Sequence, residues 1–188
     1  MDILHIARQQ LLTAIQLFFD NSDPVSVHTL AGAASEILSD LCEQAGEQPF
    51  HSAVIASNPR IDQNRYFKAR NLYRNAFKHV GRTKDEKTRN DVARNQFSDM
   101  QNDLLLFTCV EDYLRLVKRS PAEFQAMHLW FIAAYPDRLK TPKLEASSLN
   151  LLNNLHEIER EKQKEIGHIL IKEFKNNPNL MNDPRTEY

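Results

Sequence analysis

Apolar residues recur at steps of three and four positions along most of this chain, which is the period of an α-helix. Residues 3–20 carry the pattern clearly, in an apolar stripe made of Leu4, Ala7, Leu11, Ile15 and Phe18. No segment alternates apolar and polar residues over a length that indicates a β-strand. With 41% apolar and 26% charged residues, the composition is that of a globular protein. We therefore expect an all-α fold, a helical bundle of about five to six helices.

The interruptions of the pattern predict the ends of the helices. Helices are expected over residues 3–20, 24–45, 62–80, 97–118, 121–135 and 145–175. Ser120-Pro121-Ala122-Glu123 combines a capping box with a proline at the first helical position, and so marks a helix start. Residues 46–61 are expected to form a loop with a short turn of helix. Residues 82–96 are highly charged and lack an apolar period, so they are expected to form a mobile connection.

Length and composition limit the organisation and location of the protein. A chain of 188 residues suits one hydrophobic core, so residues 1–175 are expected to form a single helical-bundle domain, followed by a flexible tail at 176–188. The chain has no run of about eighteen apolar residues and no signal-peptide pattern at its start. Its two cysteines, Cys42 and Cys109, form no CxxC pair. These features predict a protein of the reducing cytoplasm that does not span a membrane.

The helix predicted at 62–80 carries the best candidate for a functional site. The formal net charge of −1 gives no overall attraction to nucleic acid, so a phosphate-binding surface has to be a local patch. Spacing of four places Arg70, Arg74 and Lys78 in one row on this helix and Asn71, Asn75 and His79 in the next row. These rows put permanent positive charge for a phosphate beside an imidazole that titrates near neutral pH.

The same residues also suit a purely structural role. Lys78 and His79 precede Gly81, and cations are common at helix C-termini because they complement the helix dipole. Arg74 and His79 are five positions apart, which is about 140° around an ideal helix. Both could reach one substrate only at a helix end or in a distorted helix, and Gly81 favours the helix end. Both side chains are expected at the surface.

The segment Arg74-Asn75-Ala76-Phe77-Lys78-His79 resembles the Arg-polar-x-x-x-His motif of HEPN domains. Together with residues 23–34, it is also similar to a group of bacterial proteins, and the resemblance covers about residues 1–135, with the last helix as an appendage. HEPN domains are small helical bundles that commonly form homodimers. Many are metal-independent ribonucleases of toxin–antitoxin and antiphage systems, and others are inactive adaptors. The resemblance implies an RNA substrate, an antitoxin or other regulatory protein as a partner, and neither cofactor nor metal.

The resemblance also implies roles for single residues. In cleavage of this type the ribose 2′-hydroxyl attacks the neighbouring phosphate. His79 would act as general acid or base, Arg74 would stabilise the charge that builds on the phosphorane, and Asn75 would orient the imidazole or the phosphate. The expected substrate-binding residues are Arg70, Asn71, Lys78 and His28. A two-fold dimer would supply a second His79, because in-line cleavage benefits from two proton-transfer groups.

Two further histidines have other possible roles, and a rival function fits the same residues. His28 lies one turn before Gly32, and its alternative role is that of a hydrogen-bonded structural histidine. Glu165 and His168 have the Glu-x-x-His spacing of metal-binding bundles, but the sequence holds no second such pair, so we assign them to a solvated helix face. The rival function is a non-catalytic helical module that binds a partner protein or a nucleotide through the same basic row.

Overall fold

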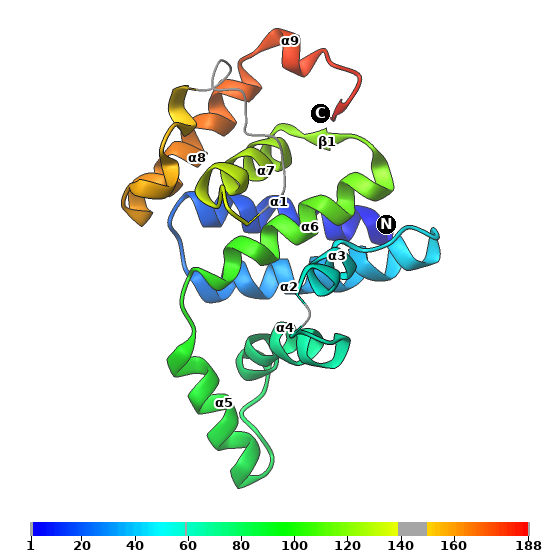
Figure 1. Ribbon diagram of the computed structural model, residues 1–188, viewed down its shortest axis with the longest axis vertical. Coiled ribbons are helices and arrows are strands. Elements are labelled where there is room, and N and C mark those ends of the chain that lie inside the picture. Colours follow the sequence, from blue (N-terminus) through cyan, green and yellow to red (C-terminus); the bar gives the residue numbers. More distant parts are fainter. Residues whose placement is uncertain (1, 59, 139–149, 188) are drawn as a thin grey trace.

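Helices make up nearly all of the regular structure in the computed structural model, which describes residues 2–58, 60–138 and 150–187. In chain order the elements are α1 (Ile3–Phe19), α2 (Pro24–Gln44), α3 (Phe50–Ser57), α4 (Gln63–Lys78), α5 (Lys84–Gln96), α6 (Gln101–Val117), β1 (Ser120–Pro121), α7 (Ala122–Ala134), the short 3-10 helices η1 (Asn150–Leu152) and η2 (Leu155–Glu157), α8 (Arg160–Lys175), α9 (Pro178–Met181) and β2 (Thr186–Glu187). The prediction of an all-α bundle is confirmed. Figure 1 shows α4 and α5 projecting from one end of the other helices.

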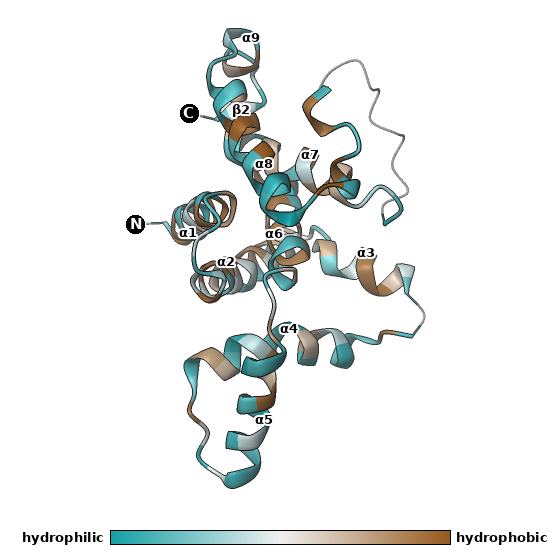
Figure 2. Cartoon of the chain, turned by 90° about the vertical axis from the view of Figure 1, so that its left-hand side faces the viewer, coloured by the Kyte–Doolittle hydropathy of each residue, from teal (hydrophilic) through white to brown (hydrophobic). Residues whose placement is uncertain are grey.

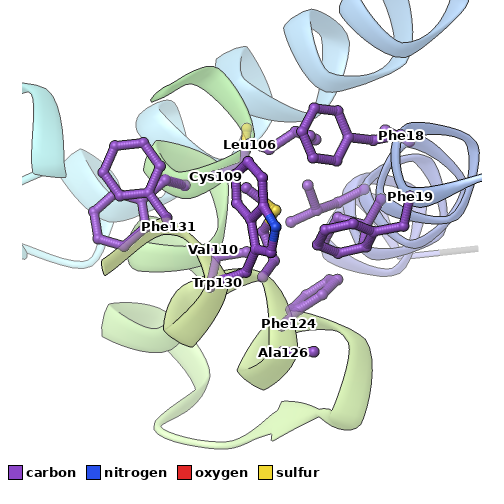
Figure 3. Close-up of a cluster of buried hydrophobic side chains, with 14 of the residues drawn as sticks. Phe18, Phe19, Leu106, Cys109, Val110, Phe124, Ala126, Trp130 and Phe131 are labelled. Carbon is purple, nitrogen blue, oxygen red and sulfur yellow. The ribbon is translucent and has the colours of Figure 1, made fainter. Parts of the chain in front are cut away.

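The hydrophobic core lies where α1, α2, α6, α7 and α8 meet. Trp130 of α7 is fully buried at its centre, with ring centroids 5.3 Å from Phe18 and 5.7 Å from Phe19. Its indole nitrogen donates a hydrogen bond to the carbonyl of Gln163 at 2.7 Å. Figure 3 shows these rings together with the side chains of α6. The apolar helix expected at 121–135 is therefore central because almost all of its large side chains face this core.

A cluster of buried charges holds α8 against α6. Lys164 is only 2% exposed, and its ammonium lies 2.8 Å from Asp99. Arg160 binds both Asp99 and Asp103 and covers the ring of Phe18. Because the buried Lys164 and Asp103 each face an opposite charge, the cluster offsets the cost of removing them from water.

The C-terminal segment, where a flexible tail was expected at 176–188, contains α9 and β2, although most residues of 176–187 are exposed to solvent. Thr186 and Glu187 pair in parallel with Ser120 and Pro121, and Thr186 is 2% exposed. The carboxylate of Glu187 accepts a hydrogen bond from Tyr113 at 2.8 Å. The capping box predicted at Ser120 is not formed. Ser120 lies in this strand pairing, and Pro121 is the N-cap of α7 without a side-chain hydrogen bond.

Two further boundaries differ from the prediction. Residues 82–96 contain α5 instead of an irregular connection. The last long helix begins only at Arg160, after η1 and η2, because Asn154 takes a left-handed conformation and Ile158 an extended one. The predicted helical residues 145–149 lie outside the described residues. No helix in the described part of the chain is long and apolar enough to cross a membrane.

Two helical glycines differ in the space around them, and this difference predicts opposite effects of alanine. A Cβ added at Gly167 would lie 2.0 Å from a ring carbon of Phe19, whereas one added at Gly32 would meet its nearest neighbour, Arg74, at 3.7 Å. We expect Gly167→Ala to lower the free energy of unfolding by about 1–3 kcal/mol through overpacking. Gly32→Ala is expected to raise it by about 0.5–1 kcal/mol through helix propensity. Urea unfolding followed by circular dichroism measures both, and equal effects would contradict the close packing of α1 and α8.

Candidate functional site

Helix α4 is attached to the bundle by an aromatic cluster on one side. Tyr73 and Phe77 of α4 pack edge-on against His28 of α2 and against Phe97, which precedes α6. Asp62 begins the helix, because its carboxylate accepts a hydrogen bond from the backbone of Arg65 at 2.8 Å. The opposite side of α4 and its C-terminal end are thereby left to face α5 and solvent.

The C-terminal end of α4 is held by side chains of α5. His79 ends the helix in an extended conformation, and its carbonyl accepts a hydrogen bond from the amide of Asn90 at 2.9 Å. Arg94 donates to the carbonyls of Ala76 and His79. Asn90 is 2% exposed, whereas His79 is exposed to solvent. The backbone of His79 is therefore fixed while its imidazole stays accessible.

The start of α5 explains how the chain turns back after His79. Thr83 and Glu86 form a reciprocal capping box, in which the Thr83 hydroxyl accepts from the backbone of Glu86 and the carboxylate accepts from the backbone of Thr83 and Arg82. These backbone hydrogen bonds hold the pKa of Glu86 below its usual value. Gly81 has a φ of 93°, and an added Cβ would lie 2.7 Å from the backbone nitrogen of Lys87. Only glycine suits this turn.

A groove follows the α4–α5 junction. One cavity of about 520 Å³ at the end of α4 is lined by the polar or charged residues Asn75, Lys78, His79, Arg82, Glu86, Arg89 and Asn90, together with Val80 and Gly81. A second cavity of about 700 Å³ lies further back along α4 and includes Lys68 and Asn71. Because Asn75 and Arg89 line both cavities, we treat them as one groove. The polar row predicted on α4, which contains Asn71, Asn75 and His79, faces this groove.

The predicted cationic row is divided among three places. Lys78 lines the groove. Arg74 turns to α2, where its guanidinium forms an ion pair with Glu36 and its aliphatic part lies over Gly32. The Arg74 side chain is 17% exposed, so the expectation that it lies at the surface was wrong. Burial lowers the pKa of Arg74, and its Nε has no hydrogen-bond partner among the described residues. Arg74 therefore lines neither of the two cavities that form the groove.

Arg70 and His28 lie away from the groove. Arg70 stacks over the ring of Phe67, with 4.7 Å from its guanidinium carbon to the ring centre. His28 is 4% exposed, and its Nδ1 lies 2.9 Å from the side-chain oxygen of Asn102. Burial lowers the pKa of His28, so it stays neutral at neutral pH. His28 has the buried, hydrogen-bonded position of a structural histidine.

Charge is distributed very unevenly between the two parts of the protein. From Gln63 to Gln96, over α4 and α5, the sequence has ten Lys and Arg residues and three Asp and Glu residues, a formal charge of +7. The rest of the chain has 14 Lys and Arg residues and 22 Asp and Glu residues, a formal charge of −8. Of the groove cations, Lys78, Arg82 and Arg89 form no ion pair with any residue that the structure describes. The hairpin of α4 and α5, here called the basic hairpin, is an electropositive surface.

Sequence reasoning missed the residues that α5 and the turn before it contribute to the groove. Arg82, Arg89 and Asn90 lie in the segment 82–96 that was expected to form a mobile connection. An apolar period could not find α5, because Asn90 and Ala93 are its only buried residues and Figure 2 shows it largely hydrophilic. The sequence Thr83-Lys84-Asp85-Glu86 is the signal that could have found it, since it matches a capping box with acidic residues in the first turn.

No group of three or more His, Cys, Asp or Glu side chains that could hold a metal ion occurs within residues 2–58, 60–138 and 150–187. His168 instead pairs with Asp20 at 2.8 Å, and Glu165 is exposed. Comparisons with protein families, with characterised proteins and with solved structures gave no match to this chain. The case for function therefore rests on the groove and on the basic hairpin.

The contact between Asn90 and the end of α4 predicts a local effect of mutation. Asn90→Ala removes the donor to the His79 carbonyl and should lower the free energy of unfolding by about 1–3 kcal/mol. Because α5 packs against α4 and projects from the bundle, amide hydrogen exchange should rise first in α5 while α1, α2 and α6 stay protected. Asn95→Ala, at an exposed position of the same helix, is the control and should change little. Uniform loss of protection would contradict this account.

Proposed function

We propose that the protein is a metal-independent endoribonuclease that binds RNA along the basic hairpin and cleaves it at His79. The observation that carries the proposal is an exposed imidazole on a fixed backbone, inside a groove in which Lys78, Arg82 and Arg89 outnumber the single carboxylate, Glu86, and form no ion pair among the described residues. Phosphate groups of a nucleic acid would balance the excess positive charge. The resemblance of the Arg74–His79 segment to the HEPN motif agrees with this reaction, and a role in a toxin–antitoxin or defence system is part of the same proposal.

The groove residues have different roles in this mechanism. The 2′-hydroxyl of the substrate attacks the adjacent phosphorus, and its proton passes to a neutral His79. The bond to the 5′-oxygen of the next nucleotide breaks, this oxygen takes a proton from the protonated His79 of a second copy of the chain, and a 2′,3′-cyclic phosphate and a 5′-hydroxyl are left. Lys78, Arg82 and Arg89 hold the phosphate and stabilise the extra negative charge of the phosphorane. Asn75 lies one helical turn before His79 on the groove side of α4, where its amide can bind a phosphate oxygen.

The proposed role of Arg74 requires a change in its partner. In the free protein the guanidinium is held by Glu36 on α2. A phosphate that competes successfully with Glu36 would draw Arg74 towards the reacting group. Glu36 is more exposed than Arg74, at 41% against 17%, so the acid can move into solvent when the pair separates. The ion pair with Glu36 would then hold the Arg74 guanidinium away from the groove until the substrate binds.

A second function is favoured by one specific observation. The groove of a single chain holds one histidine, whereas in-line cleavage benefits from an acid and a base, and Arg74 is already paired. The alternative is a module that binds RNA, a nucleotide or a partner protein through the basic hairpin without turnover. Such a module would lose affinity steeply as salt rises, because binding to phosphates releases counterions.

The proposed chemistry predicts cleavage in the absence of metal. The purified protein should cut single-stranded RNA in EDTA and leave 2′,3′-cyclic phosphate ends, because the nucleophile is the substrate's own hydroxyl. His79→Ala should lower the rate about 10²–10⁴-fold by removing the proton-transfer group. His5→Ala removes another exposed histidine, on α1, and should leave the rate unchanged. Gel analysis of end-labelled RNA measures this, and full activity of the His79→Ala protein would rule out the assignment.

Arg74 and Glu36 can be separated in the same assay. Arg74→Gln should lower the cleavage rate about 10²–10³-fold if the guanidinium stabilises the phosphorane. Glu36→Gln frees the guanidinium and should leave the rate equal to or above that of the unaltered protein. If the pair is only structural, the two variants will lose stability and activity to the same extent.

The need for a second proton-transfer group predicts a homodimer with a two-fold axis near the end of α4. Val80, beside His79, is 78% exposed and would be covered in such a dimer. Sedimentation equilibrium at micromolar concentration should give twice the chain mass of 21.8 kDa. Val80→Asp should shift the protein to monomers and reduce cleavage. A monomer that cleaves RNA at full rate would show that the second histidine is not required.

A further inference from the structure

A third cavity, of about 470 Å³, lies between α2, α3, α4 and α6. It shares no residue with the cavity around His79 and only Ala69 with the other cavity of the groove. Its walls are mostly apolar, with Val54 of α3, Ile61 before α4, and Leu104 and Leu105 of α6. Tyr66 and Tyr73 add two aromatic rings from α4. Its volume is in the range of sites for small molecules, and apolar walls that include aromatic rings suit a planar ligand.

One histidine that lines this cavity has a buried ring nitrogen without a hydrogen-bond partner among the described residues. His28 lines the cavity, is 4% exposed, and its Nε2 makes no hydrogen bond to any described residue. The other nitrogen, Nδ1, contacts the side-chain oxygen of Asn102, whose amide nitrogen donates to the carbonyl of Pro24 at 3.0 Å. That second bond fixes the oxygen of Asn102 towards His28, so Nδ1 carries the proton. Nε2 therefore presents a lone pair and can only accept a hydrogen bond.

The unpaired nitrogen points to a ligand that donates. A buried acceptor without a partner costs about 1–3 kcal/mol, and a ligand with an N–H group would recover this cost. The aromatic rings of Tyr73, Phe77 and Phe97 that surround His28 offer no strong acceptor or donor of their own to Nε2. A simple hydrocarbon or fatty acid chain would fill the apolar walls but would leave Nε2 unpaired.

Two guanidinium groups at the cavity favour an anionic ligand. Arg65 has a side chain that is 72% exposed and lies 3.9 Å from Asp62. Arg70 stacks on Phe67 and forms no ion pair within the described parts of the chain. Guanidinium groups bind phosphates through paired N–H donors. The ligand should therefore carry a phosphate in addition to its N–H donor.

We propose that this cavity binds a nucleoside monophosphate unit, with the base between the apolar walls, a base N–H donated to Nε2 of His28, and the phosphate at Arg65 and Arg70. The unit can be a free nucleotide or one unstacked nucleotide of a single-stranded RNA, because both present the same base and phosphate. The site does not depend on catalysis by His79. It gives Arg70 a partner and explains why His28 keeps one nitrogen unpaired.

Binding of two matched nucleotides tests the proposal. Adenosine 5′-monophosphate carries an amine on its base, whereas purine riboside 5′-monophosphate has the same shape and no N–H donor on its base. We expect the first to bind about tenfold more tightly in calorimetric titration, the value of one net hydrogen bond of about 1.4 kcal/mol. The nitrogen resonance of His28 Nε2 should shift when the adenine nucleotide is added and not with its purine analogue. Equal binding of the two nucleotides, or no shift, would overturn the proposal.

Variants of the cavity complete the test. Arg70→Gln should weaken binding about tenfold or more by removing a charged donor to the phosphate. Lys84→Gln removes one positive charge from α5 at a position outside this cavity and should have no comparable effect. Ala69→Phe fills the cavity from an exposed position of α4 and should abolish binding while the circular dichroism spectrum stays unchanged. Binding that survives both cavity variants would place the nucleotide elsewhere.

A parallel titration identifies the source of the nucleotide. The His79→Ala protein is titrated with an oligouridine that contains one adenosine, so that cleavage cannot interfere. A His28 shift with this RNA and not with the free nucleotide assigns the cavity to one nucleotide of a bound strand, whereas the reverse result assigns it to a free nucleotide. A protein that cleaves RNA but shows neither shift would refute this site and leave the function proposed for His79 intact.

Discussion

The carbonyl groups at the end of α4 are the constraint on which the arrangement of the site depends. A helix cannot satisfy its own last carbonyls, and here Asn90 and Arg94 donate to those of His79 and Ala76. This contact requires α5 to lie beside α4, and the tight turn at Gly81 brings it there. The groove between them and the exposed position of His79 follow from the same contact. Helix α5 buries little apolar surface and is thus kept in place mainly by hydrogen bonds.

The second feature of the molecule is the separation of its charges. An overall charge of −1 conceals a basic hairpin of +7 and a remainder of −8. Concentrated positive charge on a projecting hairpin repels other cations and attracts a polyanion, whereas the acidic bundle would orient such a polyanion away from itself. The ion pair between Arg74 and Glu36 lies at the boundary between the two parts. An anion that binds the basic hairpin at this boundary would change the contact between Arg74 and Glu36, and so the contact between α4 and α2.

The sequence was sufficient for elements whose apolar stripe faces the core. Helices α1, α2 and α7 begin and end within about two residues of the predicted limits. The sequence did not predict the elements that are held in place by interactions other than apolar burial. Helix α5 depends on caps, and the segment around Thr186 depends on a pairing with Ser120 that is distant in the chain. For the site, helical spacing identified the row of Asn71, Asn75 and His79, but it could not show that Glu36 draws Arg74 to α2. Helical spacing gives the face on which a side chain lies, but the residue that it contacts on a neighbouring helix depends on tertiary packing.

The most direct test of the account is to map where RNA touches the protein, independent of turnover. Amide resonances of isotope-labelled His79→Ala protein can be followed while a short single-stranded RNA is added at low salt. The account predicts that the largest shifts fall within residues 63–96, with Lys78, Arg82 and Arg89 among them, and that they fade as salt is raised. Shifts confined to α1, α7 and α8, or no shifts at any salt concentration, would contradict the claim that the basic hairpin is the functional surface.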